Sequence, residues 1–311
     1  MMNPEQTAFV FPGQGSQAVG MGFALAEAFP IARNIFEQAN LWLGFDLSKL
    51  AWEGPEEELN DTINTQPALL VHSVAVWSVY QELNPGFRPA FVAGHSMGEL
   101  SALVAAGALT YDKAIHLVRR RGELMKQAGH VSPGGMAAIM GLDITSLEQI
   151  CSQASIADEI VQVANDNCPG QVVISGAGPA LERALTLAQQ AGARRAKALA
   201  VSIAAHSPLM MHAQADFNQA VNAAPIIDPR VPLVGNVTAA PLTKASQVRA
   251  DLQAQLTSRV RWTESVRTMI AQGVTTFLEL GSGSVLTGLL KRIDPEVVGL
   301  AIGNPEDFAK L

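Results

Sequence analysis

Short apolar runs alternate with longer segments of helical character along most of the chain. Four runs are short and rich in apolar side chains, which predicts buried strands: residues 7–11, 90–93, 231–235 and 275–280. Six segments have the composition or the apolar spacing of helices: residues 21–41, 66–83, 99–108, 114–127, 260–272 and 285–291. Strands that alternate with helices are typical of a mainly parallel sheet covered by helices. The pattern therefore predicts an α/β fold for most of the chain.

The middle of the chain has a different order of elements. Gly, Ser and Pro cluster at residues 129–135, as they do in linkers. The next segments predict strand, helix, strand, strand, helix and strand, at residues 136–141, 145–155, 160–164, 171–175, 179–192 and 195–201. This is the order of a ferredoxin-like unit. We therefore predict a small inserted α+β domain at residues 129–199 and a large domain made of residues 1–128 and 200–311.

Composition and charge narrow the class of protein. The sequence has 311 residues, 48% of them hydrophobic, so it can bury a large core. The net charge of -7 argues against nucleic acid as the main partner. Cys151 and Cys168 form no Cys-x-x-Cys pair, which favours reduced intracellular thiols. Neither a signal peptide nor an apolar run long enough to span a bilayer is present, so we expect a cytoplasmic protein that binds no membrane.

The strongest candidate for chemistry is the sequence Gly-His-Ser-Met-Gly at residues 94–98. It follows a predicted strand and precedes a predicted helix, which is the context of a nucleophile elbow. Gly94 and Gly98 lack side chains and so permit a tight turn that exposes the hydroxyl of Ser96. A plain strand-to-helix turn is the alternative. The context favours Ser96 as a nucleophile.

A serine hydroxyl needs a base, and histidine is the usual one. His206 is our candidate, because it precedes Ser-Pro and lies C-terminal to Ser96, as the base does in hydrolase folds where serine precedes histidine. A loop histidine without a catalytic role is the alternative. The remaining histidines lie on predicted helices, in the linker or directly beside the nucleophile: His72, His95, His116, His130 and His212. No acidic residue stands in a suitable loop between Ser96 and His206, so we expect a dyad in which a backbone carbonyl orients the histidine.

Two further features have both a functional and a plain structural interpretation. The loop at residues 12–17 is either a simple turn or a rigid loop whose amide near Gln14 is an oxyanion donor, together with the amide of Met97. It lacks the spacing of a phosphate-binding loop. The arginines at residues 119–121 form either a solvated helix face or a site where one arginine grips a carboxylate and the outer ones attract an acidic partner.

Several motifs in order give the chain a resemblance to a known family. They are Phe-Pro-Gly-Gln-Gly-Ser-Gln at 11–17, Thr-Gln-Pro-Ala at 65–68, Gly-His-Ser-Met-Gly-Glu at 94–99, Arg-Gly at 121–122, and the stretches 165–176 and 281–290. With these motifs the sequence resembles the malonyl-CoA:acyl carrier protein transacylases of fatty acid synthesis and the related acyltransferase domains of polyketide synthases. The resemblance covers nearly the whole chain. It implies an α/β-hydrolase-like large domain with a ferredoxin-like insert.

The resemblance also implies roles for single residues. Ser96 would be the acyl-enzyme nucleophile and His206 its base, with the amides of Met97 and Gln14 as the oxyanion hole. Arg121 would clamp the malonyl carboxylate and Gln66 would line the substrate site. The chain departs from the family pattern in having Met97 where leucine is usual, Ser282 and Ser284 in the turn before the last helix, and small apolar residues at 203–205. The last of these leaves open a bulkier acyl branch.

The implied reaction moves a malonyl group from malonyl-CoA to the phosphopantetheine thiol of acyl carrier protein by a ping-pong route, for fatty acid biosynthesis. Coenzyme A thioester is then a substrate, and we expect no cofactor, no metal and a monomer. Three alternatives use the same residues differently. They are a discrete polyketide synthase acyltransferase, an acyl-thioester hydrolase with the same Ser-His dyad, and a non-catalytic module that docks carrier protein.

Overall fold

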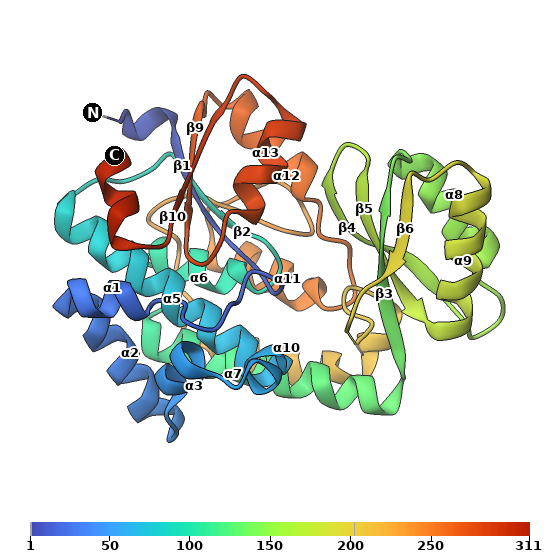
Figure 1. The fold of residues 1–311 in the computed structure, drawn as a ribbon, viewed down its shortest axis with the longest axis horizontal. Helices are drawn as coiled ribbons and strands as arrows, with labels where there is room; N and C mark the ends of the chain where they lie inside the picture. Colours follow the sequence, from blue (N-terminus) through green and yellow to red (C-terminus); the bar gives the residue numbers. More distant parts are fainter. Residues whose placement is uncertain (1, 202) are drawn as a thin grey trace.

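The computed structural model describes residues 2–201 and 203–311 and divides them between two sheets (Figure 1). Residues 1 and 202, which the sequence assigns to the large domain, lie outside the described residues. One sheet has six strands and is mostly parallel, whereas the other has four antiparallel strands. The predicted fold class, an α/β large domain with a small α+β insert, is confirmed.

The larger sheet has the strand order β10-β9-β1-β2-β7-β8. Its strands are β1 (Thr7–Phe11), β2 (Phe91–Gly94), β7 (Leu233–Val234), β8 (Pro241–Leu242), β9 (Thr276–Leu280) and β10 (Val298–Ile302). The four other pairs are parallel, and only β7 and β8 run antiparallel. Phe11 lies opposite Gly94 at the ends of the two central strands. The turns that follow β1 and β2 therefore meet at one edge of the sheet, where open α/β sheets bind ligands.

Helices cover this sheet on both sides (Figure 1). The α-helices of the large lobe are α1 (Phe23–Ala28), α2 (Pro30–Leu43), α3 (Leu47–Glu53), α4 (Glu56–Asn60), α5 (Thr62–Leu83), α6 (Gly98–Ala105), α7 (Tyr111–Val131), α10 (Met211–Ala223), α11 (Ala245–Gln255), α12 (Trp262–Ala271) and α13 (Val285–Ile293). Short 3-10 turns are η1 (Pro4–Gln6), η2 (Pro208–Met210) and η3 (Pro305–Lys310). The single helix predicted at residues 21–41 is wrong. Two helices meet there, because Pro30 begins a new helix after the extended residue Phe29.

Helix α5 begins earlier than the sequence pattern predicts. Its cap is Asp61, whose side chain accepts a hydrogen bond from the amide of Ile63, so Pro67 lies inside the helix and does not open it. Proline has no amide hydrogen, so it cannot bond to the carbonyl four residues before it. That carbonyl belongs to Ile63, and it accepts a hydrogen bond of 3.1 Å from Arg119 on α7 instead. A tertiary contact thus replaces the missing helical bond.

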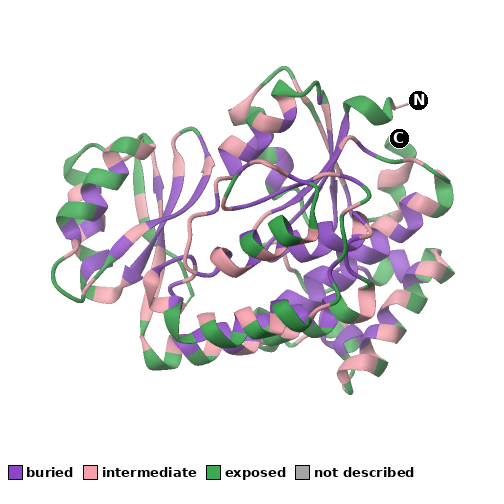
Figure 2. Ribbon diagram, turned by 180° about the vertical axis from the view of Figure 1, so that it is seen from behind, coloured by how far each residue is buried: buried purple, intermediate pink, exposed green. Residues whose placement is uncertain are grey.

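The core of the large lobe lies between the sheet and α5, which is buried over most of its length (Figure 2). Phe9 of β1 packs edge-on against Tyr80 of α5, with ring centroids 4.9 Å apart. A second core of the large lobe lies on the other face of the sheet, where Trp262 and Phe277 are fully buried. Both faces of the sheet are therefore covered, as the apolar character of its strands requires. No helix of the described residues is long and apolar enough to cross a membrane.

The smaller sheet has the strand order β4-β5-β3-β6. Its strands are β3 (Gly134–Met140), β4 (Val161–Cys168), β5 (Gln171–Ala177) and β6 (Arg195–Ala198), and its helices are α8 (Ile144–Ala154) and α9 (Gly178–Gln190). The two helices pack together on one face of the sheet, around their own small core (Figure 1). The predicted boundary at residue 129 falls in the last turns of α7, which continues to Val131. We retain the division at residues 129–199 as a proposal.

Candidate active site

The turn after β2 holds Ser96 in a strained backbone conformation. Its φ is 51°, in the left-handed region that residues with a side chain rarely adopt. A Cβ atom on Gly94 would overlap the backbone of Gly98, and one on Gly98 would overlap the carbonyl of Phe11. The two glycines are therefore required for the turn to close against β1. Strain of this kind is typical of a nucleophile elbow.

Ser96 and His206 lie in direct contact although 110 residues separate them. The distance from Ser96 Oγ to His206 Nε2 is 2.8 Å, and His206 Nδ1 lies 2.8 Å from the carbonyl oxygen of Gln255. A carbonyl oxygen only accepts, so Nδ1 carries the hydrogen and Nε2 is free to accept the serine proton. The backbone carbonyl expected beside the histidine is therefore present, and it belongs to Gln255 at the end of α11.

The environment of His206 keeps its ring neutral. The side chain is buried, and burial together with the nearby positive charge of Arg121 lowers the pKa of His206 from 6.5 to about 3. A neutral imidazole is the form that can accept a proton. The geometry and the charge state of this pair are thus those of a nucleophile and its general base.

One of the three consecutive arginines points into the same site. Arg121 is only 2% exposed, and its guanidinium donates to the side-chain oxygens of Gln66 and Gln255 at 2.9 and 2.8 Å and to Ser96 Oγ at 3.1 Å. Burial lowers its pKa to about 10, partly opposed by the charge of Glu99, so the group remains positive at neutral pH. Its hydrogen-bond partners in the described structure are all uncharged groups, and Nε has none. The guanidinium can therefore bind an anion beside Ser96.

The other two arginines have different surroundings. Arg119 is bound to the start of α5, and Arg120 lies at the surface beside Asp216 at 3.3 Å. Gly122 lets α7 approach α5 closely, since a Cβ there would lie 2.9 Å from the carbonyl oxygen of Thr62. Arg121 alone is in the site because helical residues advance by about 100° each.

Gln66 links Arg121 to the loop after β1. Its amide donates to Thr62 Oγ1 at 2.9 Å, and this hydroxyl donates to Gln14 Oε1, also at 2.9 Å. The loop itself packs against the elbow, because a Cβ on Gly13 would lie 2.5 Å from the carbonyl oxygen of His95. Met97, directly after Ser96, is the N-cap residue of α6. The structure therefore brings the Gln14 loop, Gln66 and Met97 to the same edge of the sheet as Ser96.

Two amide side chains that no sequence motif identified hold the elbow in place. Asn236 Oδ1 accepts from the amide of Ser96 at 2.8 Å, and the Gln255 side chain donates to the carbonyl of Ser96 at 3.2 Å. Both amides also donate to the same oxygen of Glu99, at 2.6 and 2.5 Å. Glu99 is fully buried, and burial followed by the charge of Asp251 raises its pKa well above the usual value. This cluster fixes both backbone groups of Ser96.

The other candidate histidines lie outside the dyad. His95 turns to the smaller sheet, where its Nε2 lies 2.8 Å from Asn167 Oδ1, and its ring packs edge-on against Trp262. His72 is buried in α5 with Nε2 at 3.0 Å from the carbonyl of Gly303. Burial lowers the pKa of His72 to about 4. In the described part of the chain, no group of three or more His, Cys, Asp or Glu side chains is placed to hold a metal ion.

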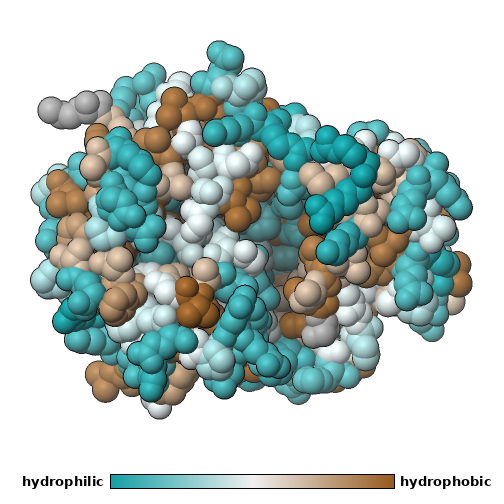
Figure 3. Space-filling model, viewed as in Figure 1, coloured by the Kyte–Doolittle hydropathy of each residue, from teal (hydrophilic) through white to brown (hydrophobic). Residues whose placement is uncertain are grey.

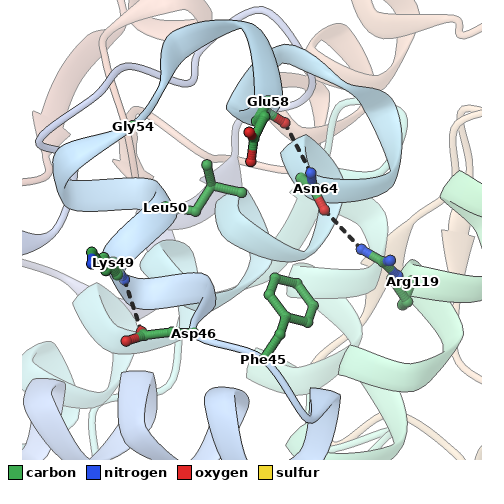
Figure 4. A pocket seen from close by; sticks show the side chains of 8 residues that line it. All are labelled: Phe45, Asp46, Lys49, Leu50, Gly54, Glu58, Asn64 and Arg119. Carbon is green, nitrogen blue, oxygen red and sulfur yellow. Dashed lines mark hydrogen bonds between the residues drawn. The ribbon is translucent and has the colours of Figure 1, made fainter.

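The molecular surface has a hollow between the two lobes (Figure 3) and a separate cavity on the large lobe. The face drawn in Figure 3 is hollowed where the two lobes meet, and both hydrophilic and hydrophobic residues surround this hollow. A separate surface cavity of about 320 Å³ lies over α3, α4 and α7 (Figure 4) and is lined by Phe45, Asp46, Lys49, Glu58, Asn64 and Arg119 among others. Ser96, Arg121 and His206 are not among its lining residues. The chemistry of the dyad therefore does not belong to this cavity.

Comparison with known proteins agrees with the geometry. A family model described as "Acyl transferase domain" matches residues 8–297. A Bacillus subtilis protein named malonyl CoA-acyl carrier protein transacylase is 46% identical over 299 residues, which are 96% of this chain and 94% of that protein. The crystal structure of an acyl carrier protein S-malonyltransferase from Vibrio cholerae has a TM-score of 0.94 and 44% identity, over 98% of this chain and 99% of that one. A malonyl-transacylase solved in complex with a type II PKS acyl-carrier protein gives the same TM-score and identity, over 98% of each chain.

Proposed function

The chain belongs to the acyl transferase domain family and is an acyltransferase, and from this premise we propose that it transfers malonyl groups from malonyl-CoA to acyl carrier protein. The observation that carries the proposal is the contact of one serine hydroxyl with both a neutral histidine and a buried arginine. His206 Nε2 lies 2.8 Å and Arg121 Nη2 lies 3.1 Å from Ser96 Oγ. A base and an anion-binding group at the same nucleophile suit an acyl group that carries a carboxylate.

In the first half-reaction, Ser96 Oγ attacks the thioester carbonyl of malonyl-CoA while its proton passes to His206 Nε2. The carbonyl oxygen becomes an oxyanion, for which the amides of Met97 and Gln14 are the proposed donors. One donor of this kind contributes about 2.7–4 kcal/mol in a serine hydrolase. When the C–S bond breaks, the sulfur of coenzyme A takes the proton from His206 and leaves as a thiol, and a malonyl ester remains on Ser96.

The second half-reaction follows the same path in reverse. The phosphopantetheine thiol of the carrier protein gives its proton to His206 and attacks the malonyl ester. The C–O bond then breaks and Ser96 takes back the proton. Because one base serves both halves, His206 must be neutral in the free enzyme and again in the acyl-enzyme. Its lowered pKa supports this cycle.

Arg121 is the proposed ligand of the malonyl carboxylate, and Gln66 holds it. Two side-chain amide oxygens fix two nitrogens of the guanidinium but leave its positive charge uncompensated by direct ionic contact. A carboxylate in the site would provide the negative charge that pairs with the guanidinium, whereas an acetyl group carries no charge. We therefore expect malonyl-CoA to be preferred over acetyl-CoA.

The pH dependence of acylation follows from the pKa of His206. The base is active when unprotonated, so lowering its pKa from 6.5 to about 3 extends the active range toward acid. We predict that the rate constant for acylation of Ser96 stays constant between about pH 8 and 5. Stopped-flow release of coenzyme A at saturating malonyl-CoA measures it. A decline centred near the ordinary histidine pKa would contradict the proposed environment.

We further propose that the acceptor is a carrier protein of fatty acid synthesis, that the enzyme needs no cofactor, and that it acts as a cytoplasmic monomer. The residues proposed for catalysis, Ser96, His206 and Arg121, contact one another within a single chain, which supports a monomer. The relatives are named for acyl carrier protein, and one solved relative is bound to a polyketide carrier, so a discrete polyketide role is a second candidate. The molecular mass in solution, measured by light scattering, tests whether the protein is a monomer.

To test the function, the purified enzyme is mixed with malonyl-CoA and purified holo carrier protein. Malonyl carrier protein should form, with coenzyme A released in equal amount. Free malonate in place of malonyl carrier protein would favour the hydrolase alternative. Comparing fatty acid and polyketide carriers as acceptors at equal concentration decides between the two pathways.

A further inference from the structure

The backbone of His206, like that of Ser96, lies in the left-handed region that residues with a side chain rarely adopt. Among the described residues, four that are not glycine have a positive φ, and two of them are Ser96 at 51° and His206 at 58°. Such conformations cost roughly 1–3 kcal/mol and persist only where the surrounding structure holds them. Asn236 and Gln255 hold the backbone of Ser96, as described above. The corresponding support for the backbone of His206 lies in a different part of the chain.

That support is Gln162 on β4, the edge strand of the smaller sheet. Its amide nitrogen donates to the carbonyl oxygen of His206 at 2.7 Å and to that of Thr257 at 3.2 Å. Both partners are acceptors, so the amide must present its NH₂ group to them. Thr257 follows Gln255 by two residues, and Gln255 supplies the carbonyl that orients the histidine ring. One side chain thus ties the backbone of the base to the segment that holds its ring.

Strand β4 is itself fixed to this segment. The amide of Asp166 donates to the carbonyl of Val260 at 2.9 Å, and the amide of Val260 donates to the carbonyl of Ala164 at 2.8 Å. Thr263 Oγ1 adds a hydrogen bond of 2.8 Å to Asp166 Oδ1. Figure 1 draws β4 on the side of the smaller sheet that faces the larger one. The strand that carries Gln162 is therefore hydrogen-bonded to residues 260–263 of the large lobe, which limits its movement.

We propose that Gln162 is a positioning residue for the general base, and that through it the inserted domain takes part in catalysis. The inference rests on the proposed function. Gln162 acts on the backbone of His206 and not on the reacting atoms. Without its two hydrogen bonds, the left-handed backbone of His206 relaxes and Nε2 moves away from Ser96 Oγ. A small displacement of this kind is enough to slow proton transfer.

The test compares two variants with the wild-type enzyme. Gln162→Met keeps the length of the side chain but removes the donor, and Gln162→Glu places an acceptor against two carbonyl oxygens. The rate constant for acylation at saturating malonyl-CoA should fall about tenfold in Gln162→Met, the effect of one to two hydrogen bonds, and further in Gln162→Glu at pH 8. The KM for malonyl-CoA should change less than about twofold, because Gln162 does not bind substrate. The control is Gln153→Met, at an exposed position on α8 of the same insert.

Rates are expressed per enzyme molecule that forms an acyl-enzyme, so that unfolded protein does not count. An acylation rate of Gln162→Met within twofold of the wild type would overturn the inference. A loss confined to KM would overturn it as well, because Gln162 would then act on substrate binding. If the wild-type enzyme itself forms no malonyl-serine, the proposed function fails before the variants are compared. The two failures are therefore distinguishable.

Discussion

Replacing His206 with alanine is expected to lower the rate constant for malonylation of Ser96 by about 10²–10⁴-fold, the usual contribution of a general base. The ring accepts the serine proton at Nε2, 2.8 Å from Ser96 Oγ, and alanine offers nothing in its place. Substrate binding should change little, because Arg121 and Gln66 remain. The measurement is the single-turnover release of coenzyme A from excess enzyme.

The control for this variant is His212→Ala. His212 lies at an exposed position at the start of α10, close to His206 in the sequence. It should retain the wild-type rate constant. Should His206→Ala malonylate Ser96 as fast as His212→Ala does, another group would have to be the base.

Replacing Arg121 with alanine should lower kcat/KM for malonyl-CoA by about 10- to 100-fold. This corresponds to roughly 1.5–3 kcal/mol for hydrogen bonds between charged groups. The value for acetyl-CoA should fall much less, so that the ratio between the two substrates narrows. Arg121→Lys should recover only part of the malonyl activity, since lysine keeps the charge but not the planar fork. Measuring kcat/KM for both thioesters on each variant tests this.

The matched control is Arg120→Ala, which removes the neighbouring arginine at the surface. Its partners are Asp216 and Glu123, and exposed pairs of this kind contribute little. Arg121→Ala also leaves oxygens of Gln66 and Gln255 without their donor, so thermal unfolding is followed in parallel. An unchanged preference for malonyl-CoA over acetyl-CoA in a folded Arg121→Ala protein would rule out Arg121 as the ligand of the malonyl carboxylate.

The sequence predicted those parts of the site that have a local signal. Ser96 has such a signal, because two glycines flank it and a predicted strand and a predicted helix adjoin them. His206 is predicted as the base because it lies C-terminal to Ser96 and precedes Ser-Pro. A backbone carbonyl is predicted as its partner because no acidic residue stands in a suitable loop between the two. Gln255, Asn236 and Gln162 have no local signal, and the reason is the same for all three. Their roles depend on side-chain amides that the fold brings together from separate segments, and a single glutamine or asparagine forms no motif in the sequence.

The errors in the predicted elements also have physical causes. Pro67 suggested a helix start, but the Ile63 carbonyl that it leaves free is satisfied by Arg119, a contact that cannot be seen in the local sequence. The strand predicted at residues 231–235 is only two residues long, because Pro232 has no amide hydrogen and Gly235 already turns toward β8. The predicted elements occur in the predicted order, because their apolar spacing is local, but α3, α4, α11, β8 and β10 are missing from the prediction since these short or weakly patterned segments carry little apolar spacing of their own. The ends of the predicted elements depend on tertiary contacts.

The central claim is that Ser96 carries the malonyl group between the two thioesters. Intact-mass analysis after brief mixing with malonyl-CoA, followed by peptide mapping, tests it most directly. We predict one malonyl adduct per chain, located on Ser96, absent from Ser96→Ala and removed by holo carrier protein with formation of malonyl carrier protein. An adduct on another residue, or carrier protein malonylated at the wild-type rate by Ser96→Ala, would contradict the account.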